Sequence, residues 1–481
     1  MSIRDRSFKL LMVVVAAAMF YGASRMQDTL NVQRQKEGFT TLPVLSNAPP
    51  LLAFTTVALG GFRGLIANAL WIRASELQDQ ERYFEMVQLA DWITTLEPHY
   101  STVWTHQAWN MAYNISVKCK DFEDRWRWVQ RGIQLLHKGL DWNPGDVDTY
   151  KELSWIIRHK IGQNLDDAHM TYKLHWAQMM QDVLGGHPDF AALLNPQTPE
   201  QRERVRKLRQ DYHMDPAFVQ EIDKKFGPLD WRLPEAHSIY WSEMGVRNGT
   251  AEDKELIERF AYSLMQQACK RGGSLPPWVT NVTKENFILW PNLALVTNCV
   301  ASFERVAAKF PEDKKYIVLN AEKNFLKEEI VVLYEYDRSA EANYWFNYLR
   351  DNITNSIPDR QLTMEEFALG TIQSEITELD PVKTTAFILG LITQEYLFLL
   401  GGEEDHAANV RNLAATVWRS YQSRLPEGQN GQRISLLPLP ELRDQQLRIM
   451  ETWISPQSAA LLRNLLGKPR PGPVPPPAPQ T

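Results

Sequence analysis

The residue types that carry out most protein chemistry are scattered along this chain. Its ten histidines include no His-Glu-x-x-His pair, the spacing that holds a zinc ion on one helix face. The sequence contains no Gly-x-Ser-x-Gly nucleophile turn, no Gly-x-x-x-x-Gly-Lys-Ser/Thr phosphate loop and no Gly-x-Gly-x-x-Gly dinucleotide fingerprint. We therefore predict no catalytic residue, no cofactor and no metal ion for this chain.

Acidic side chains leave one enzymatic alternative open. They cluster at Asp166-Asp167 and at Glu403-Glu404-Asp405, where solvation is the simplest explanation. A pair of carboxylates acts as acid and base only when a cleft holds them at a fixed separation, and a linear sequence does not reveal such a cleft. An exported all-helical enzyme that acts on envelope glycan or peptide therefore remains the alternative to a non-catalytic protein.

Composition and charge restrict the classes of partner. Of the 481 residues, 44% are hydrophobic and 23% are charged, so the chain has enough apolar side chains to fold around a core. A net charge of -6 gives no general attraction to nucleic-acid phosphates, and we predict no nucleic-acid partner. Three cysteines without a Cys-x-x-Cys pair exclude a disulfide scaffold and a thiolate zinc module.

An apolar segment near the N-terminus predicts attachment to a membrane. Residues 8–24 are mostly apolar, and Arg4 and Arg6 precede them. This length is close to the minimum of roughly 17 residues for a helix that crosses a bilayer, and the segment ends in a poor cleavage site. We interpret residues 1–25 as an uncleaved signal anchor, with a cleaved signal peptide as the alternative. We expect a single-pass protein of the inner (plasma) membrane with its body on the extracytoplasmic, periplasmic side.

The most informative pattern in the body is an internal repeat. Pro98 and Pro144 lie 46 residues apart. In the segments that follow these two prolines, three equivalent positions carry matching residue types. A large aromatic residue, a small residue and a tryptophan recur, as Trp104 and Tyr150, Ala108 and Ser154, and Trp109 and Trp155. An aromatic wedge followed one turn later by a small residue suits two closely packed helices. We therefore predict repeat packing roles for Trp104, Ala108, Tyr150 and Ser154.

These residues, with Gly132 in the next helix and Asn143-Pro144 at its end, resemble the tetratricopeptide repeat family. The resemblance implies an all-α fold, an α-solenoid of antiparallel helix pairs. With the anchor predicted from residues 8–24, we expect this solenoid to follow one N-terminal transmembrane helix. A period of 46 residues instead of 34 requires an insertion of about twelve residues, which we place around residues 116–124.

In this family the first helix of each pair lines a concave binding face. The resemblance therefore implies a protein-binding groove at Thr105, Trp109, Lys151, Trp155 and Arg158. Thr105 and Trp109 replace two residues of the family's peptide-carboxylate clamp, so that clamp is not supported. Trp109 and Trp155 can equally belong to the core.

Composition and helix-period patterns divide the chain into six segments. They are an anchor (1–25), a tether (26–50), tetratricopeptide-like repeats (51–185), a connector with short helices and a basic run (186–236), a second helical repeat region (237–467) and a disordered Pro-rich tail (468–481). Helices are expected over residues 62–78 and 82–96, and a further helix pair is expected on either side of Gly401-Gly402. The tail suits either a spacer or a polyproline-type ligand for an aromatic-lined groove.

These features predict a membrane-anchored helical-repeat scaffold or assembly factor that binds other proteins at the cell envelope without catalysis. Its expected partners are other proteins, such as subunits of membrane complexes, and the membrane itself through residues 8–24. The enzyme alternative differs in its surface. An enzyme needs one deep cleft with carboxylates or histidines, whereas a scaffold needs a broad groove with aromatic and mixed-charge lining.

Overall fold

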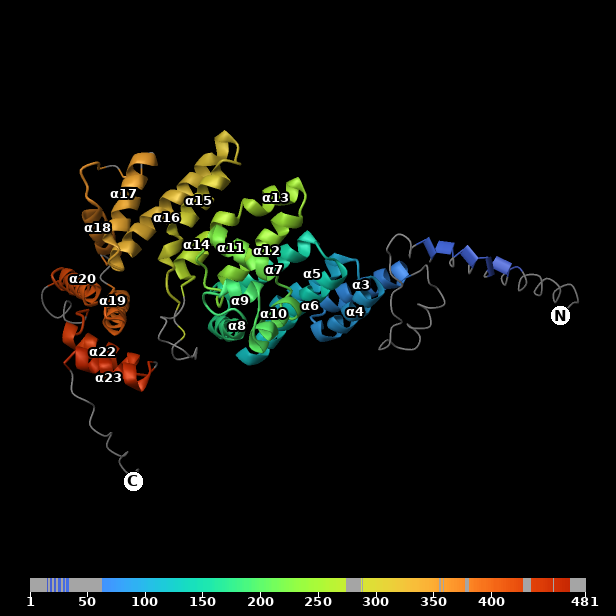
Figure 1. Ribbon diagram of the computed structural model, residues 1–481, viewed down its shortest axis with the longest axis horizontal. Helices are drawn as coiled ribbons and strands as arrows, with labels where there is room; N and C mark the ends of the chain where they lie inside the picture. Colours follow the sequence, from blue (N-terminus) through green and yellow to red (C-terminus); the bar gives the residue numbers. More distant parts are fainter. Residues whose placement is uncertain are drawn as a thin grey trace, which may run out of the picture. The chain divides into compact units, whose positions relative to one another are not determined.

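The computed structural model shows a body built from helices (Figure 1). The described residues are 63–273, 287, 289–353, 356–357, 359–376, 380–426, 434–452 and 454–467, together with scattered positions between 15 and 33. Within these residues all regular structure is helical, and the only β pairing is an isolated antiparallel bridge between Gly273 and Trp290. The prediction of an all-α protein is therefore confirmed for the described part of the chain.

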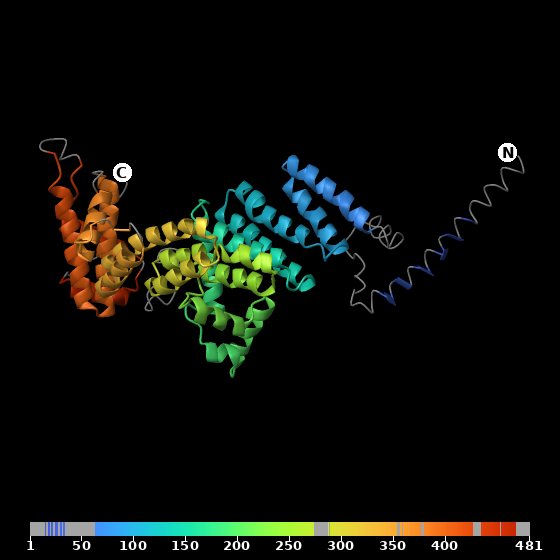
Figure 2. The same cartoon turned by 90° about the horizontal axis from the view of Figure 1, so that it is seen from above.

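Two compact units make up the chain, residues 1–107 and residues 108–481. The first unit contains helices α3 (Arg63–Asp79) and α4 (Tyr83–Leu96) and most of α5 (Ser101–Trp109). α3 and α4 lie side by side, as the blue helices of Figure 2 show. Their bounds agree to within one residue with the helices expected from the apolar period.

The second unit contains the remaining helices and two large hydrophobic cores. The first core is built mainly from η2 (Asn110–Ile115), α6 (Phe122–Trp142), α7 (Val147–Trp155), η4 (Ile156–Gly162), α8 (His169–Val183), α9 (Phe190–Leu194), α10 (Pro199–Gln210), α11 (Pro216–Phe226), α12 (Pro234–Asn248), α14 (Ala261–Arg271), η5 (Leu293–Leu295), α15 (Val296–Ala307), α16 (Lys315–Glu335) and α17 (Ser339–Asn352). The same unit contains η3 (Ser116–Lys118), α13 (Ala251–Glu258) and η6 (Glu312–Lys314). The second core involves α18 (Met364–Ile376), α19 (Pro381–Gly401), α20 (Glu404–Gln422), α22 (Leu439–Met450) and α23 (Pro456–Leu465).

The helix bounds recur at the spacing found in the sequence. α5 and α7 begin 46 residues apart and end 46 residues apart, at Trp109 and Trp155. Each then continues into a π-helix, in which backbone hydrogen bonds reach one residue further than in an α-helix. These π-helices, η2 and η4, begin at Asn110 and Ile156. The insertion expected around residues 116–124 is mostly helical, because η3 and the start of α6 occupy it.

Trp104 and Ala108, the predicted packing residues that follow Pro98, are buried. Trp104 is 1% exposed, and its indole Nε1 donates a hydrogen bond to the carbonyl oxygen of Pro98 at 2.9 Å. Ala108 is fully buried at the end of α5, where α6 passes very close. A Cβ added to Gly132 of α6 would stand only 2.8 Å from the backbone oxygen of Ala108. The small residues at these two positions therefore permit the backbones to approach.

Tyr150 and Ser154, the predicted packing residues that follow Pro144, are buried against α12. The Tyr150 ring stacks on Trp241 with ring centroids 5.9 Å apart. The Ser154 hydroxyl donates a hydrogen bond to the carbonyl oxygen of Ser238 at 2.8 Å. The small side chain at position 154 thus brings α7 and α12 within direct hydrogen-bonding distance.

Helix α19 is long and apolar enough to cross a membrane, judged by length and composition alone. It packs on α20, α22 and α23 in the second core, and core helices of soluble proteins pass the same test. Glu395 on this helix is fully buried and forms ion pairs with Arg411, at 2.8 Å, and with Arg443. The helix ends at Gly401, and Gly402 has the left-handed φ of 79° that favours glycine. The helix pair expected on either side of these glycines is confirmed.

The predicted anchor, residues 8–24, lies largely outside the described residues. Within it, the described positions Val15, Met19 and Tyr21 are helical and exposed. Most of the tether and the whole tail, residues 468–481, also lie outside the described part of the chain.

Candidate functional site

Trp109 and Trp155 lie at the exposed ends of a row of aromatic rings. Trp109 is 37% exposed and stacks on Tyr113, with ring centroids 5.6 Å apart. Trp155 is 40% exposed and stacks on His159, with ring centroids 4.6 Å apart. In both pairs the second ring lies four residues further along the chain, on the π-helix. The two pairs therefore occupy equivalent positions, 46 residues apart.

A contact between the inner rings joins the two pairs. Tyr113 Oη lies 3.1 Å from His159 Nδ1, within hydrogen-bonding distance, and the two ring centroids are 5.7 Å apart. We name Trp109, Tyr113, His159 and Trp155 the aromatic row. Because each ring is held by its neighbour, this surface offers a large contact area with little conformational entropy to lose on binding.

Burial shifts the pKa values of two groups in and beside the aromatic row. Burial raises the pKa of Glu152 to about 7. Burial, together with the positive charges of Arg158 and Lys160, lowers the pKa of His159, so that this ring is neutral at pH 7. The Arg158 guanidinium lies 5.2 Å from the centroid of the Trp155 ring and adds a cation–π contact. Lys160 Nζ lies 5.4 Å from the centroid of the Tyr113 ring. The row is therefore an aromatic surface with one cation at the Trp155 end and another against Tyr113.

Two other residues predicted for the groove already have partners in the fold. Thr105 lies in the first unit, where its hydroxyl donates to the carbonyl oxygen of Thr102 at 3.2 Å. Lys151 forms ion pairs with Asp148 at 3.0 Å and with Asp253 at 3.4 Å. Of the residues predicted for the groove, the structure brings together Trp109, Trp155 and Arg158.

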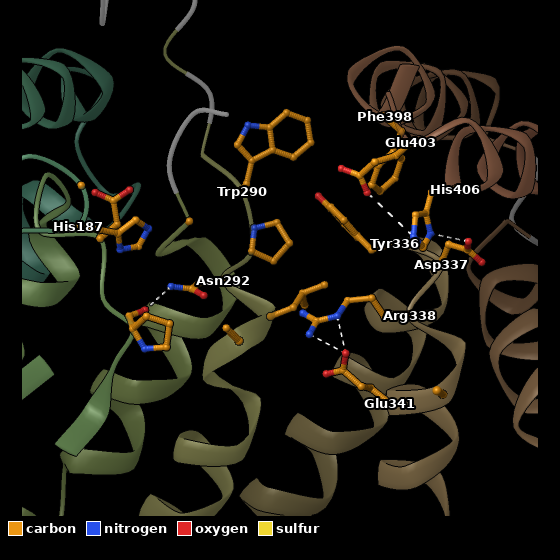
Figure 3. Close-up of a pocket in the computed structure, with 18 of the residues that line it drawn as sticks. His187, Trp290, Asn292, Tyr336, Asp337, Arg338, Glu341, Phe398, Glu403 and His406 are labelled. Atoms are coloured by element: carbon orange, nitrogen blue, oxygen red, sulfur yellow. Dashed lines mark hydrogen bonds and ion pairs between the residues drawn. The ribbon is translucent and has the colours of Figure 1, made fainter. Parts of the chain in front are cut away.

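A cavity of about 1010 Å³ lies at a different place in the second unit (Figure 3). Separate stretches of chain line it: Gly186 and His187; Pro228, Asp230 and Arg232; Gly273 and residues 290–294; residues 336–341; and Phe398, Glu403 and His406. Its volume is at the upper end of the range found for small-molecule sites, about 300–1,000 Å³.

Aromatic rings form one part of the cavity lining. Trp290 and Tyr336 stand perpendicular to each other, with ring centroids 6.4 Å apart and an interplanar angle of 89°. Phe398 of α19 lies against the ring of His406 at 5.5 Å. Figure 3 shows these rings around the upper part of the cavity, so a ligand would meet flat apolar faces there.

Among the described residues, every charged side chain that lines the cavity has a partner in the fold. The pairs are Arg232–Asp230 (2.8 Å), Arg338–Glu341 (2.6 Å), His406–Asp337 (2.8 Å) and His406–Glu403 (4.0 Å). Four carboxylates and two guanidinium groups give the described lining a net charge of -2 when its histidines are neutral. The lining therefore disfavours anions and favours neutral or cationic ligands.

Backbone geometry fixes two of these charged groups. Asp337 connects α16 to α17 with a left-handed φ of 56°, and its carboxylate accepts hydrogen bonds from His406 and from Asn409 Nδ2, each at 2.8 Å. Gly186 lies so close to Arg232 that an added Cβ would stand 2.7 Å from the guanidinium. Glycine at this position therefore lets Arg232 lie against the loop.

A buried lysine network lies outside both surfaces. Lys173 is fully buried, and burial lowers its pKa to about 7. Its Nζ contacts Gln163 O at 3.0 Å, Asn164 Oδ1 at 3.3 Å and His169 Nδ1 at 2.9 Å. None of these residues lines the cavity. Because Lys173 Nζ bonds to Gln163 and Asn164, the network holds the loop before α8 in place. No group of three or more metal-ligating side chains is placed to hold an ion among the residues that the structure describes.

Comparison with known proteins adds no relationship. No protein-family model matches this sequence, and no curated protein and no solved structure matches it.

Sequence reasoning did not find the cavity. Its residues lie between Gly186 and His406, in stretches that no local spacing connects. The only sequence signals are runs in which a large aromatic residue precedes polar residues, as in Tyr336-Asp337-Arg338, and such runs occur in many loops.

Proposed function

We propose that this chain is a membrane-anchored helical-repeat scaffold or assembly factor that binds other proteins at the cell envelope without catalysis. The observation that carries the proposal is the aromatic row, where exposed rings recur at the 46-residue spacing. Tryptophan and tyrosine are enriched among the residues that dominate binding energy at protein interfaces. A recurring exposed ring is also expected of an array whose repeats share one binding face.

The finer parts of the proposal have separate support. The tetratricopeptide-like α-solenoid is supported by the 46-residue spacing shared by both ends of α5 and α7 and by the starts of η2 and η4. The N-terminal transmembrane helix is supported by the composition of residues 8–24, and the basic residues before them favour an extracytoplasmic body. The partners would then be subunits of membrane complexes.

Crosslinking followed by affinity purification from solubilised membranes tests this function. The double variant Trp109→Ala, Trp155→Ala should lose the crosslinked partners that the wild-type chain retains. Tyr344→Ala is a matched control, because Tyr344 is an aromatic residue of α17 that is 62% exposed outside the aromatic row. Equal recovery of the same partners with all three proteins would contradict the assignment of the binding face.

A second candidate function, an exported enzyme acting on envelope glycan or peptide, has one specific observation in its favour. In the cavity, Asp337 accepts a hydrogen bond from His406 Nδ1, an arrangement in which a carboxylate orients a histidine as a general base. Hydrolysis of isolated envelope glycan or of model peptides that disappears in His406→Ala would favour the enzyme. No turnover by the wild-type protein would favour the scaffold.

A further inference from the structure

The side chains that line the cavity beside α19 restrict the kind of ligand that can bind there. Trp290, Tyr336 and Phe398 offer aromatic faces (Figure 3), and the described lining residues carry a net charge of -2 when the histidines are neutral. Glu403 is the most weakly paired carboxylate of the lining, because its partner is His406 at 4.0 Å. The fitting ligand therefore combines flat apolar groups with positive charge, and a phosphate or an acidic peptide is disfavoured.

We propose that this cavity binds the proline-rich segment of the same chain, residues 468–481. Seven of these fourteen residues are proline, and the only charged side chains are Lys468 and Arg470. Such a segment favours the polyproline II helix, whose proline rings pack flat on aromatic side chains at little cost in conformational entropy. The two cations complement the negative lining, and Glu403 is the carboxylate available to pair with one of them.

The connection to the rest of the chain makes this contact accessible. The described chain continues to Gly467, directly after α23, and α23 packs on α19, the helix that carries Phe398 (Figure 1). Fourteen residues in a polyproline II helix extend about 43 Å, at about 3.1 Å per residue. The segment therefore starts on a helix packed against one wall of the cavity and has ample length to enter it.

Tethering also raises the effective concentration of the segment. A short flexible connection gives an effective concentration of the order of millimolar, so a peptide of modest free affinity stays bound in cis. The intact chain should thus compete with any added copy of its own segment.

A synthetic peptide with the sequence of residues 468–481 tests the proposal by calorimetry. The titrated proteins are the full-length chain and a variant that ends at Gly467, both purified in detergent. The shortened chain should bind the peptide with a stoichiometry of one, and the full-length chain should bind it at least ten-fold more weakly. A peptide with Lys468→Ser and Arg470→Ser should bind the shortened chain more weakly, with less dependence on salt.

Variants of the shortened chain locate the site. Phe398→Ala should weaken peptide binding at least ten-fold, and Glu403→Lys should do the same at an exposed position where folding is not at risk. Trp109→Ala should leave peptide binding unchanged, which separates this cavity from the aromatic row and from the scaffold function assigned to that row.

Three results would overturn the proposal. The first is no binding of the peptide to the shortened chain. The second is equal affinity for the full-length and shortened chains, which would mean that the segment does not occupy the cavity in cis. The third is binding that survives Phe398→Ala and Glu403→Lys.

Discussion

Exposure separates the four aromatic residues that match at the 46-residue spacing into two kinds. Trp104 and Tyr150, the wedges, are at most 6% exposed, whereas Trp109 and Trp155 keep more than a third of their surface open. Trp104→Ala and Tyr150→Ala should therefore each lower the free energy of unfolding by roughly 3–5 kcal/mol. Trp109→Ala and Trp155→Ala should each cost less, roughly 0.5–1.5 kcal/mol, because they remove an aromatic pair at a partly solvated position. Denaturant melts of the four variants measure this difference, and large losses at all four positions would assign the exposed pair to the core.

Glu329 of α16 gives a pH-dependent contribution to stability. It is 2% exposed, and burial raises its pKa from 4.5 to about 7. Between these pH values the folded state holds a proton that the unfolded state has lost, so stability is full below pH 4.5 and falls as the pH rises through 7. Glu329→Gln cannot ionise and should stabilise the protein by about 3 kcal/mol at pH 8, with little effect at pH 4.

Thermal melts of the Glu329→Gln variant across this pH range measure the effect. Glu252→Gln, at an exposed position of α13, is the control and should follow the wild-type curve. A wild-type pH profile that Glu329→Gln leaves unaltered would show that this carboxyl group is ionised in the folded protein.

At the residue scale, repetition decided what the sequence could predict. The 46-residue spacing aligns Ala108 with Ser154, and this alignment predicted that both small residues lie against another helix. In the structure each of them does lie against the backbone of a neighbouring helix. Pairs such as Tyr113 with His159 were not predicted, since neither residue repeats the type of the other. The exposure of Trp109 and Trp155 also depends on which helices cover them, and a sequence pattern gives only their side of the helix.

The contact between the end of α5 and α6 is controlled by single atoms. A Cβ at position 132 would stand 2.8 Å from the Ala108 backbone oxygen, which a Cβ does not tolerate. Gly132→Ala should destabilise the protein by about 1–3 kcal/mol through overpacking. In α18, Gly370 has no atom within 4 Å of the added Cβ, so Gly370→Ala should stabilise the helix by up to about 1 kcal/mol. Opposite shifts of the melting temperature are the expected result, and two shifts of the same sign would contradict this contact.

Helix α19 depends on one buried charge. Glu395 is fully buried and neutralises Arg411 and Arg443 from neighbouring helices. Glu395→Ala should cost about 3–5 kcal/mol, because it leaves two partly buried guanidinium groups without their carboxylate. Glu203→Ala removes an exposed, solvent-screened ion pair with Arg206 on α10 and should leave the free energy of unfolding nearly unchanged. Chemical denaturation compares the two variants, and similar small losses would argue that Glu395 is solvated in solution.

The ends of helices were predictable where residues with distinctive backbone preferences, such as glycine, mark them. The end of α19 follows from Gly401-Gly402, since only glycine adopts the left-handed turn at low cost. The π-helices were not predictable, because an extra residue per turn leaves the residue types unchanged. The extra residues in the π-helices account for part of the additional length that the sequence analysis assigned to an insertion.

For the whole molecule, the apolar N-terminal segment predicts attachment to the membrane. The full-length protein should remain in the pellet after a carbonate wash, because a spanning helix resists extraction. A chain that begins at residue 40 should be soluble, since it lacks residues 8–24 but keeps α19, whose buried face is covered by its neighbours. Sedimentation and immunoblotting measure both. Retention of the shortened chain in the pellet would instead point to insertion of α19.

The matched π-helices also bear on the history of the chain. A π-helix holds more residues per turn than an α-helix, so inserting a single residue into an α-helix is one way to form it. If the two 46-residue segments descend from one duplicated ancestor, that insertion predates the duplication, because the same event at equivalent positions would otherwise have occurred twice. The ancestor then already carried the widened turn after its tryptophan, and the divergence of Tyr113 and His159 into a bonded pair came later.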